Sequence, residues 1–141
     1  FWLLSFLLLY TTVKGLKTAT SNFSGLGFKA LPAVLIYGLF QTSLPEELLF
    51  RGFLLKRLAS RLSFVVANTI QAALFGLLHG LMFITVLSWQ QTLLIILCTG
   101  GIAAYMGFVN EKKSDGSVLA SWIIHALANV ITGTLSAFML I

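Results

Sequence analysis

Apolar runs recur along the whole chain, and short polar or basic stretches separate them. Hydrophobic residues make up 58% of the 141 residues, and charged residues make up only 9%. A soluble domain of ordinary composition carries about 25% charged residues and about 45–50% apolar ones. A soluble fold of this size cannot bury so many apolar side chains, so lipid must be the solvent for most of the surface. The composition therefore predicts an all-α protein that crosses a membrane several times.

Five apolar segments are expected to form the helices of this bundle. They cover residues 1–13, 30–55, 62–87, 92–109 and 118–141. A spanning helix needs about 20 residues, which the third and fifth segments exceed and the fourth nearly reaches. The first segment has no basic stretch before it, which disfavours a signal peptide, and we interpret it as the tail of a span. Residues 1–29 are then a partial span with a polar connector, and residues 30–141 form the core.

The basic residues lie between the apolar segments, where they predict the orientation of the bundle. The loops at 56–61 and 110–117 together carry five of them, and the stretch at 14–29 on the opposite side carries three. Because Lys and Arg accumulate on the cytoplasmic side, the first two loops are expected to face the cytoplasm. The net charge of +5 is distributed in these short clusters. No basic patch with interleaved aromatic residues indicates nucleic-acid binding.

Small residues predict where the membrane helices touch. Gly76 and Gly80 form a G-x-x-x-G pair around His79, and a second small-residue strip covers residues 100–107. Such faces let membrane helices approach closely, so the third segment is expected to pack against a neighbour near His79. The single Cys98 excludes an intrachain disulfide and has no metal-ligand spacing to another Cys or His, which favours a packing role.

Charged residues interrupt the second apolar segment at Glu46, Glu47 and Arg51. A charge in the hydrocarbon core costs about 2.5–3.5 kcal/mol, so such residues indicate function. The i,i+4 spacing predicts that Arg51 binds Glu47, whereas Glu46 is turned away by about 100° and is free for other work. The structural alternative is a helix that starts at Pro45 at the membrane surface, with the acids complementing its dipole.

Polar residues also interrupt the third and fifth segments. His79 lies in the third, and His125 and Asn129 lie one helical turn apart in the fifth, on one face. Each taken alone is explained equally well as a hydrogen-bonded packing residue or an interhelical clamp. Their occurrence together with the acidic pair favours a shared site.

Three motifs then appear in a fixed order along the chain. They are Glu46-Glu47-x-x-x-Arg51, Phe75-x-x-x-His79 and His125-x-x-x-Asn129. In this order the sequence resembles the CPBP (Abi) family of membrane endopeptidases, which includes the type II CAAX prenyl endopeptidases. The resemblance covers residues 30–141.

The resemblance implies a helical bundle around a polar intramembrane cavity and peptide hydrolysis without a cofactor. By position, Glu46 would be the general base, His79 would help to activate the water, and His125 with Asn129 would stabilise the oxyanion. Glu47, Arg51 and Phe75 would support them. The implied substrate is a membrane-tethered or prenylated peptide, and the implied location is a prokaryotic cell membrane, with the site open to the cytoplasmic side.

Other functions stay open at the level of sequence. Two His and one Glu are also a zinc ligand set, although no H-E-x-x-H motif is present. A non-catalytic membrane partner, such as a bacteriocin self-immunity protein, would use the polar cluster as a lock or a binding site. A small transporter or proton relay would also place Glu and His in the membrane. No Ser or Cys has a His and an acid in an evident nucleophile motif.

Overall fold

The computed structural model describes residues 18–140, and those residues form helices and no strand. Residues 31–59 are one long helical run, here called the composite helix, whose backbone stays in the right-handed helical region at every junction. It consists of α2 (Leu31–Ile36), the π-helical η3 (Tyr37–Ser43), α3 (Leu44–Glu47), the π-helical η4 (Leu48–Leu55) and α4 (Lys56–Ala59). The predicted span at 1–13 lies outside the described residues.

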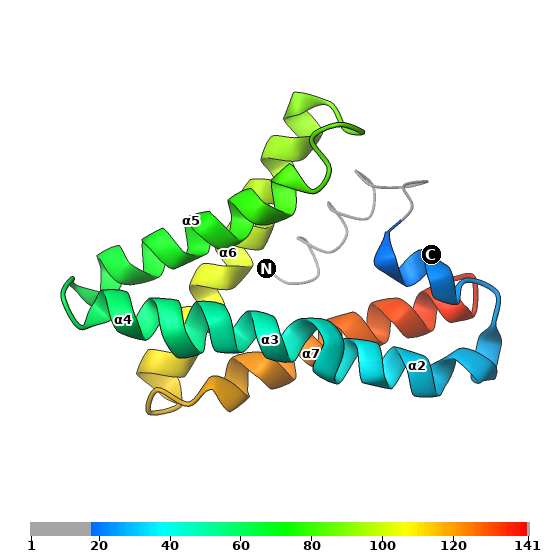
Figure 1. Cartoon of the computed structure of the whole chain (residues 1–141), viewed down its shortest axis with the longest axis horizontal. Coiled ribbons are helices and arrows are strands. Elements are labelled where there is room, and N and C mark those ends of the chain that lie inside the picture. Colours follow the sequence, from blue (N-terminus) through cyan, green and yellow to red (C-terminus); the bar gives the residue numbers. More distant parts are fainter. Residues whose placement is uncertain (1–17, 141) are drawn as a thin grey trace.

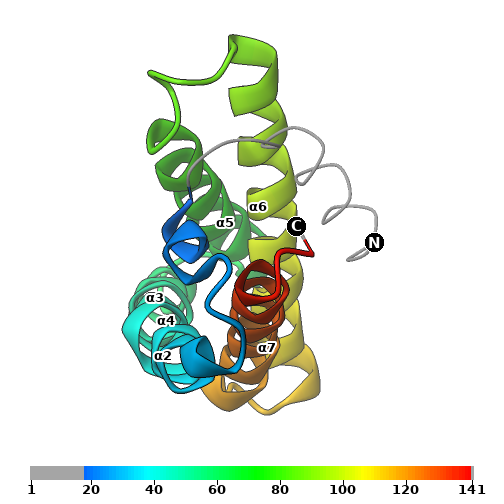
Figure 2. The ribbon, with the colours of Figure 1, turned by 90° about the vertical axis from the view of Figure 1, so that its right-hand side faces the viewer.

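Within residues 18–140, three more long helices complete the bundle, and two short 3-10 helices precede it. The long ones are α5 (Phe64–Leu81), α6 (Trp89–Lys113) and α7 (Val118–Ala137), and the short ones are η1 (Ala19–Phe23) and η2 (Gly27–Ala30). The composite helix and α7 lie side by side and antiparallel, and α5 with α6 form a second pair that crosses them (Figure 1). The view along the composite helix shows α7 beside it and α6 on the other side of α7 (Figure 2).

The helices α5, α6 and α7 are each long and apolar enough to cross a membrane. Large apolar side chains remain exposed on the outer faces, among them Val65, Leu97 and Ile131. In a membrane these faces contact lipid, which removes the need to bury them. The predicted helical membrane bundle is therefore confirmed.

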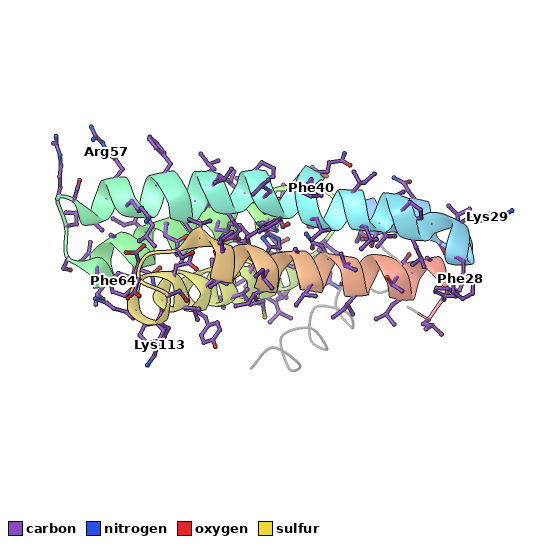
Figure 3. All side chains as sticks on the ribbon, turned by 90° about the horizontal axis from the view of Figure 1, so that it is seen from below. Phe28, Lys29, Phe40, Arg57, Phe64 and Lys113 are labelled. Atoms are coloured by element: carbon purple, nitrogen blue, oxygen red, sulfur yellow. The ribbon has the colours of Figure 1, made fainter. Side chains whose placement is uncertain are left out.

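Two of the predicted loops meet at one end of the bundle. Lys56 Nζ donates a hydrogen bond of 2.7 Å to the Gly116 carbonyl, so the stretches 56–61 and 110–117 share an end. Lys29 lies at the opposite end (Figure 3). For Lys29 this agrees with the predicted grouping of the basic residues, whereas Lys14 and Lys17 lie outside the described residues. The cytoplasmic assignment itself stays a prediction.

Several predicted boundaries were wrong because the helices continue through polar residues. Helix α4 includes part of the expected connector at 56–61, and α6 extends to Lys113, into the expected loop at 110–117. Basic residues in a last turn complement the helix dipole, which permits both extensions. Residues 88–91, which separate the third and fourth predicted segments, form the first turn of α6, because the Ser88 side chain caps the helix in a capping box with Gln91.

The helix start expected as an alternative at Pro45 is also wrong, because Pro45 lies inside the composite helix. Proline lacks an N–H and clashes with the carbonyl four residues earlier, and the preceding π-helical segment gives that turn a wider spacing. Side chains bind carbonyls of this segment: Ser43 Oγ donates to the Gly38 oxygen at 2.5 Å, and Trp122 Nε1 donates to the Leu39 oxygen at 2.8 Å. The composite helix therefore continues to the acidic pair.

Close packing of α5 against α6 confirms the expectation from the small residues. A Cβ added to Gly76 would overlap the Ile96 carbonyl oxygen of α6. Asn68 Nδ2 donates to the Ala104 carbonyl at 2.9 Å, which adds a polar link along the same interface. Cys98 is buried on α6, as expected for a packing residue.

Candidate active site

A fully buried ion pair forms the base of the site. Arg51 Nη1 lies 2.8 Å from Glu47 Oε1, and neither side chain is exposed to solvent. The same carboxylate oxygen is 2.9 Å from His125 Nδ1 on α7. The predicted pairing of Glu47 with Arg51 is confirmed, and the structure adds His125 as a third member.

Phe75 on α5 lies at the centre of this cluster. The Arg51 guanidinium lies over its ring, 4.5 Å from the centroid. The His79 ring stacks on it with centroids 4.3 Å apart, and the His125 ring meets it edge-on at 6.2 Å. Cation–π contact and stacking hold the three polar groups around one aromatic ring.

The Nδ1 atoms of the two histidines are held by acceptors. His79 Nδ1 lies 2.9 Å from the Phe75 carbonyl oxygen, and His125 Nδ1 lies 2.9 Å from the Glu47 carboxylate. A carbonyl oxygen and a carboxylate only accept hydrogen bonds, so both Nδ1 atoms carry the proton and donate. In the neutral form, each Nε2 atom then has a free lone pair.

Both Nε2 atoms face Glu46. His79 Nε2 and His125 Nε2 lie 4.0 and 3.9 Å from Glu46 Oε2. That oxygen is buried and makes no hydrogen bond to the described residues, although a third of the Glu46 side chain is exposed. The composite helix, α5 and α7 thus bring one carboxylate oxygen and two imidazole nitrogens together.

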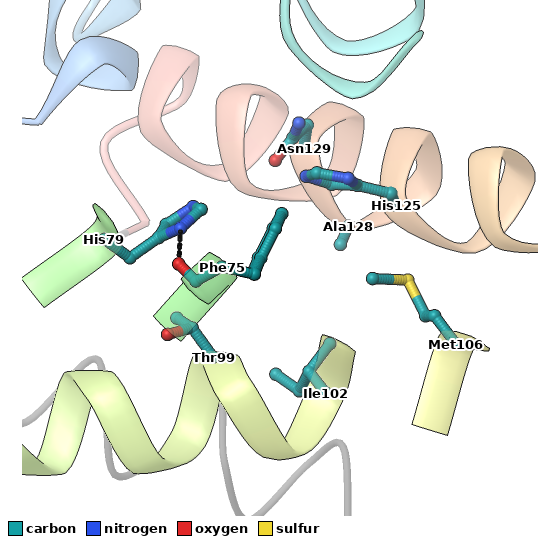
Figure 4. Close-up of a pocket in the computed structure, with 8 residues that line it drawn as sticks. All are labelled: Phe75, His79, Thr99, Ile102, Met106, His125, Ala128 and Asn129. Atoms are coloured by element: carbon teal, nitrogen blue, oxygen red, sulfur yellow. Dashed lines mark hydrogen bonds between the residues drawn. The ribbon is translucent and has the colours of Figure 1, made fainter. Parts of the chain in front are cut away.

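Asn129 lies on the same side of α7 as His125, and both line one cavity (Figure 4). Asn129 Nδ2 donates a hydrogen bond of 2.9 Å to Thr42 Oγ1. Thr42 was missed by the sequence interpretation. It lies four residues before Glu46, and a helix predicted to continue through Pro45 would have placed both on one face.

The cavity beside the two histidines measures about 140 Å³. Its walls come from α5, α6 and α7, and half of the side chains that line it are apolar. The lining residues are Phe75, His79, Thr99, Ile102, Met106, His125, Ala128 and Asn129.

A zinc site would use Glu46, His79 and His125. Tetrahedral zinc with bonds of about 2.0–2.2 Å holds its ligand atoms about 3.3–3.5 Å apart. The three side chains would therefore have to draw together from their separations of 3.9 and 4.0 Å. Among residues 18–140, no group of three or more His, Cys, Asp or Glu side chains is arranged to hold a metal ion.

The fold and site together define a helical membrane protein with a carboxylate and two imidazoles converging between its helices. The family model described as type II CAAX prenyl endopeptidase Rce1-like matches residues 28–131. The match includes all three motifs and most of the chain, so the protein belongs to this family, and the predicted resemblance is confirmed. Comparison with curated proteins and with solved structures gave no match.

Proposed function

We propose that this protein is an intramembrane endopeptidase that hydrolyses a peptide bond of a membrane-tethered or prenylated substrate, using a water activated by Glu46 and His79. Membership of the CAAX-type protease family supports the reaction class. The observation that supports the mechanism is the approach of two Nε2 atoms to Glu46 Oε2, at 3.9 and 4.0 Å. Direct hydrogen bonds are shorter than this, and one bridging water fits the separation.

In the proposed first step, Glu46 Oε2 takes a proton from the water while His79 Nε2 accepts the other hydrogen and orients the attack. The water oxygen bonds to the substrate carbonyl carbon, and the carbonyl electron pair moves to its oxygen. As the C–N bond then breaks, the proton returns from Glu46 to the leaving nitrogen. The products are an acid and an amine, and the carboxylate is restored.

His125 would serve as an oxyanion donor in this scheme, as the family resemblance implies. Its Nδ1–H is committed to Glu47, so its Nε2 donates only when the ring is an imidazolium. Asn129 would supply the second donor, as the family resemblance implies.

The cavity is the proposed binding site for one apolar substrate side chain next to the scissile bond. A dry apolar cavity of about 150 Å³ holds a molecule the size of benzene, and larger organic ligands need about 300–1,000 Å³. At about 140 Å³ the cavity has room for a single substrate side chain.

Ala128→Phe should fill this cavity and reduce kcat/KM by at least about tenfold for peptides with a large apolar residue beside the scissile bond, because a misfit in an apolar pocket costs about 1–3 kcal/mol. Peptides with Gly or Ala there should be less affected. Leu127→Phe is the matched control, since Leu127 directly precedes Ala128 on α7 and its side chain is exposed. An equal loss for all peptides would contradict the cavity assignment.

The proposed function is tested by incubating the purified protein with prenylated and unprenylated membrane-tethered peptides, with and without a metal chelator. Cleavage that survives chelation supports the glutamate–water mechanism. Loss on chelation and recovery with zinc would indicate a zinc enzyme built on the same residues. Binding of the peptides without cleavage would favour a non-catalytic partner, such as an immunity protein.

A further inference from the structure

Five exposed cations gather at one end of the bundle, here called the basic end. They come from α4, the turn after it and the last turn of α6, and they are Lys56, Arg57, Arg61, Lys112 and Lys113. The bond from Lys56 Nζ to the Gly116 carbonyl brings these stretches together, although they are distant in the sequence. Lys56 is thereby engaged within the protein, which leaves four cations for contacts outside it.

The other parts of the bundle surface carry far less charge. Two acidic residues accompany the five cations, Glu111 and Asp115, and the Glu111 carboxylate is half-buried and turned towards the loop that follows α6. Residues 81–90 between α5 and α6 carry no charge, and Lys29 is the one charged residue from 18 to 45. Figure 3 shows Lys29 at the end opposite Arg57. The positive charge of the described residues is therefore concentrated at the basic end.

The cations continue the lipid-facing surfaces of their own helices. Phe108 is exposed on α6 one turn before Lys112, and Phe53 is exposed on the composite helix one turn before Arg57. Residues one turn apart share a helix face. Where such a face contacts acyl chains, the next turn reaches the level of the lipid headgroups. Long basic side chains keep their stems on the apolar surface there and place the charge in the polar region.

Phe64 links the two basic stretches at this level. The Lys112 ammonium lies over its ring, 4.7 Å from the centroid, and Arg61 precedes it by three residues. Lys112 is thus held close to the segment that carries Arg61. Leu62 and Val65, on either side of Phe64, have exposed side chains. This surface therefore offers cations and apolar groups together.

We propose that the basic end binds the headgroups of anionic phospholipids, so that such lipids are enriched around this part of the bundle. A phospholipid supplies both parts that the surface fits, an anionic headgroup for the cations and acyl chains for the exposed Phe53 and Phe108. In a zwitterionic lipid, the headgroup amine balances the phosphate charge, and a soluble acidic peptide would match the cations alone. The proposal does not depend on the proposed enzymatic function.

The measurement uses the full chain reconstituted in bilayers that contain spin-labelled phosphatidylglycerol or spin-labelled phosphatidylcholine. Electron paramagnetic resonance gives the fraction of each lipid that is motionally restricted by the protein. Because each Lys or Arg near the surface favours an anionic headgroup about fivefold, we expect phosphatidylglycerol to associate at least about threefold more strongly at low salt. The preference should fall as salt is raised, since the Debye length shrinks from about 10 Å at 0.1 M to about 3 Å at 1 M.

Charge variants test which residues are responsible. Changing Arg57, Arg61, Lys112 and Lys113 together to Gln should remove the preference. The matched control exchanges Lys and Arg at the same four positions, which keeps the charge and should keep the preference. Lys29→Gln, at the opposite end, should have no effect. If the fourfold Gln variant does not elute as a single species, the two pairs are changed separately, and each pair should lower the preference.

Three results would overturn the proposal. The first is equal association of both lipids with the wild type, and the second is a preference that survives the change of all four cations to Gln. The third is loss of the preference when inorganic phosphate replaces chloride at the same ionic strength, which would indicate a site for free phosphate. If the wild type shows no lipid preference but binds a soluble acidic peptide through these cations, the basic end serves a peptide partner instead.

Discussion

Glu46→Gln should lower kcat by about 10²–10⁴-fold, the usual contribution of a general base, while the protein stays folded. Glutamine has the shape of glutamate but cannot take the proton from the water. Folding should survive because a third of the Glu46 side chain is exposed and its Oε2 makes no hydrogen bond to the described residues. The measurement is single-turnover cleavage of a tethered peptide by detergent-purified protein.

The control for this experiment is Glu111→Gln, an identical change on α6 beside the Gly116 loop. Its kcat should match the wild type. Elution as a single species from a sizing column establishes folding for each variant. Full activity of Glu46→Gln would place the general base elsewhere and remove the basis of the mechanism.

Contacts within one helix were predictable from the sequence. The pairing of Glu47 with Arg51 follows from their four-residue spacing, because the residues of one turn meet the next whatever the tertiary fold. The close approach of α5 and α6 at Gly76 follows from the small side chains of both. Such features depend on neighbours a few residues away, or on composition alone.

For contacts between helices, the sequence predicted only that the polar residues share one site, and not which atoms meet. Nothing in the spacing of His79 and His125 shows that their Nε2 atoms face one oxygen of Glu46, because that depends on how three helices pack. The binding of His125 to Glu47 was missed for the same reason. Thr42 was missed because Pro45 looked like a helix boundary, and the π-helical turn that accommodates a proline has no marker in the residue pattern.

Arg51→Met should destabilise the fold, whereas Glu46→Gln should leave it intact. The guanidinium and Glu47 are both fully buried, and removing one partner leaves an uncompensated charge inside the bundle. Breaking a buried pair in this way typically costs about 3–5 kcal/mol. The stacking of Arg51 on Phe75 is lost as well. Equilibrium unfolding in mixed detergent micelles measures the change, and Arg57→Met is the control, since Arg57 is exposed.

Replacing both partners separates the charge from the packing. Glu47→Leu combined with Arg51→Met removes both buried charges, and such apolar replacements are often neutral or stabilising. The double variant should therefore recover much of the stability lost by Arg51→Met, but not the activity, since His125 would have no acceptor for its Nδ1–H. If Arg51→Met alone unfolds as the wild type does, the ion pair does not hold the bundle together. Glu47 would then not be needed for the fold, and the division of roles, with Glu46 for the chemistry and Glu47 for the fold, would be wrong.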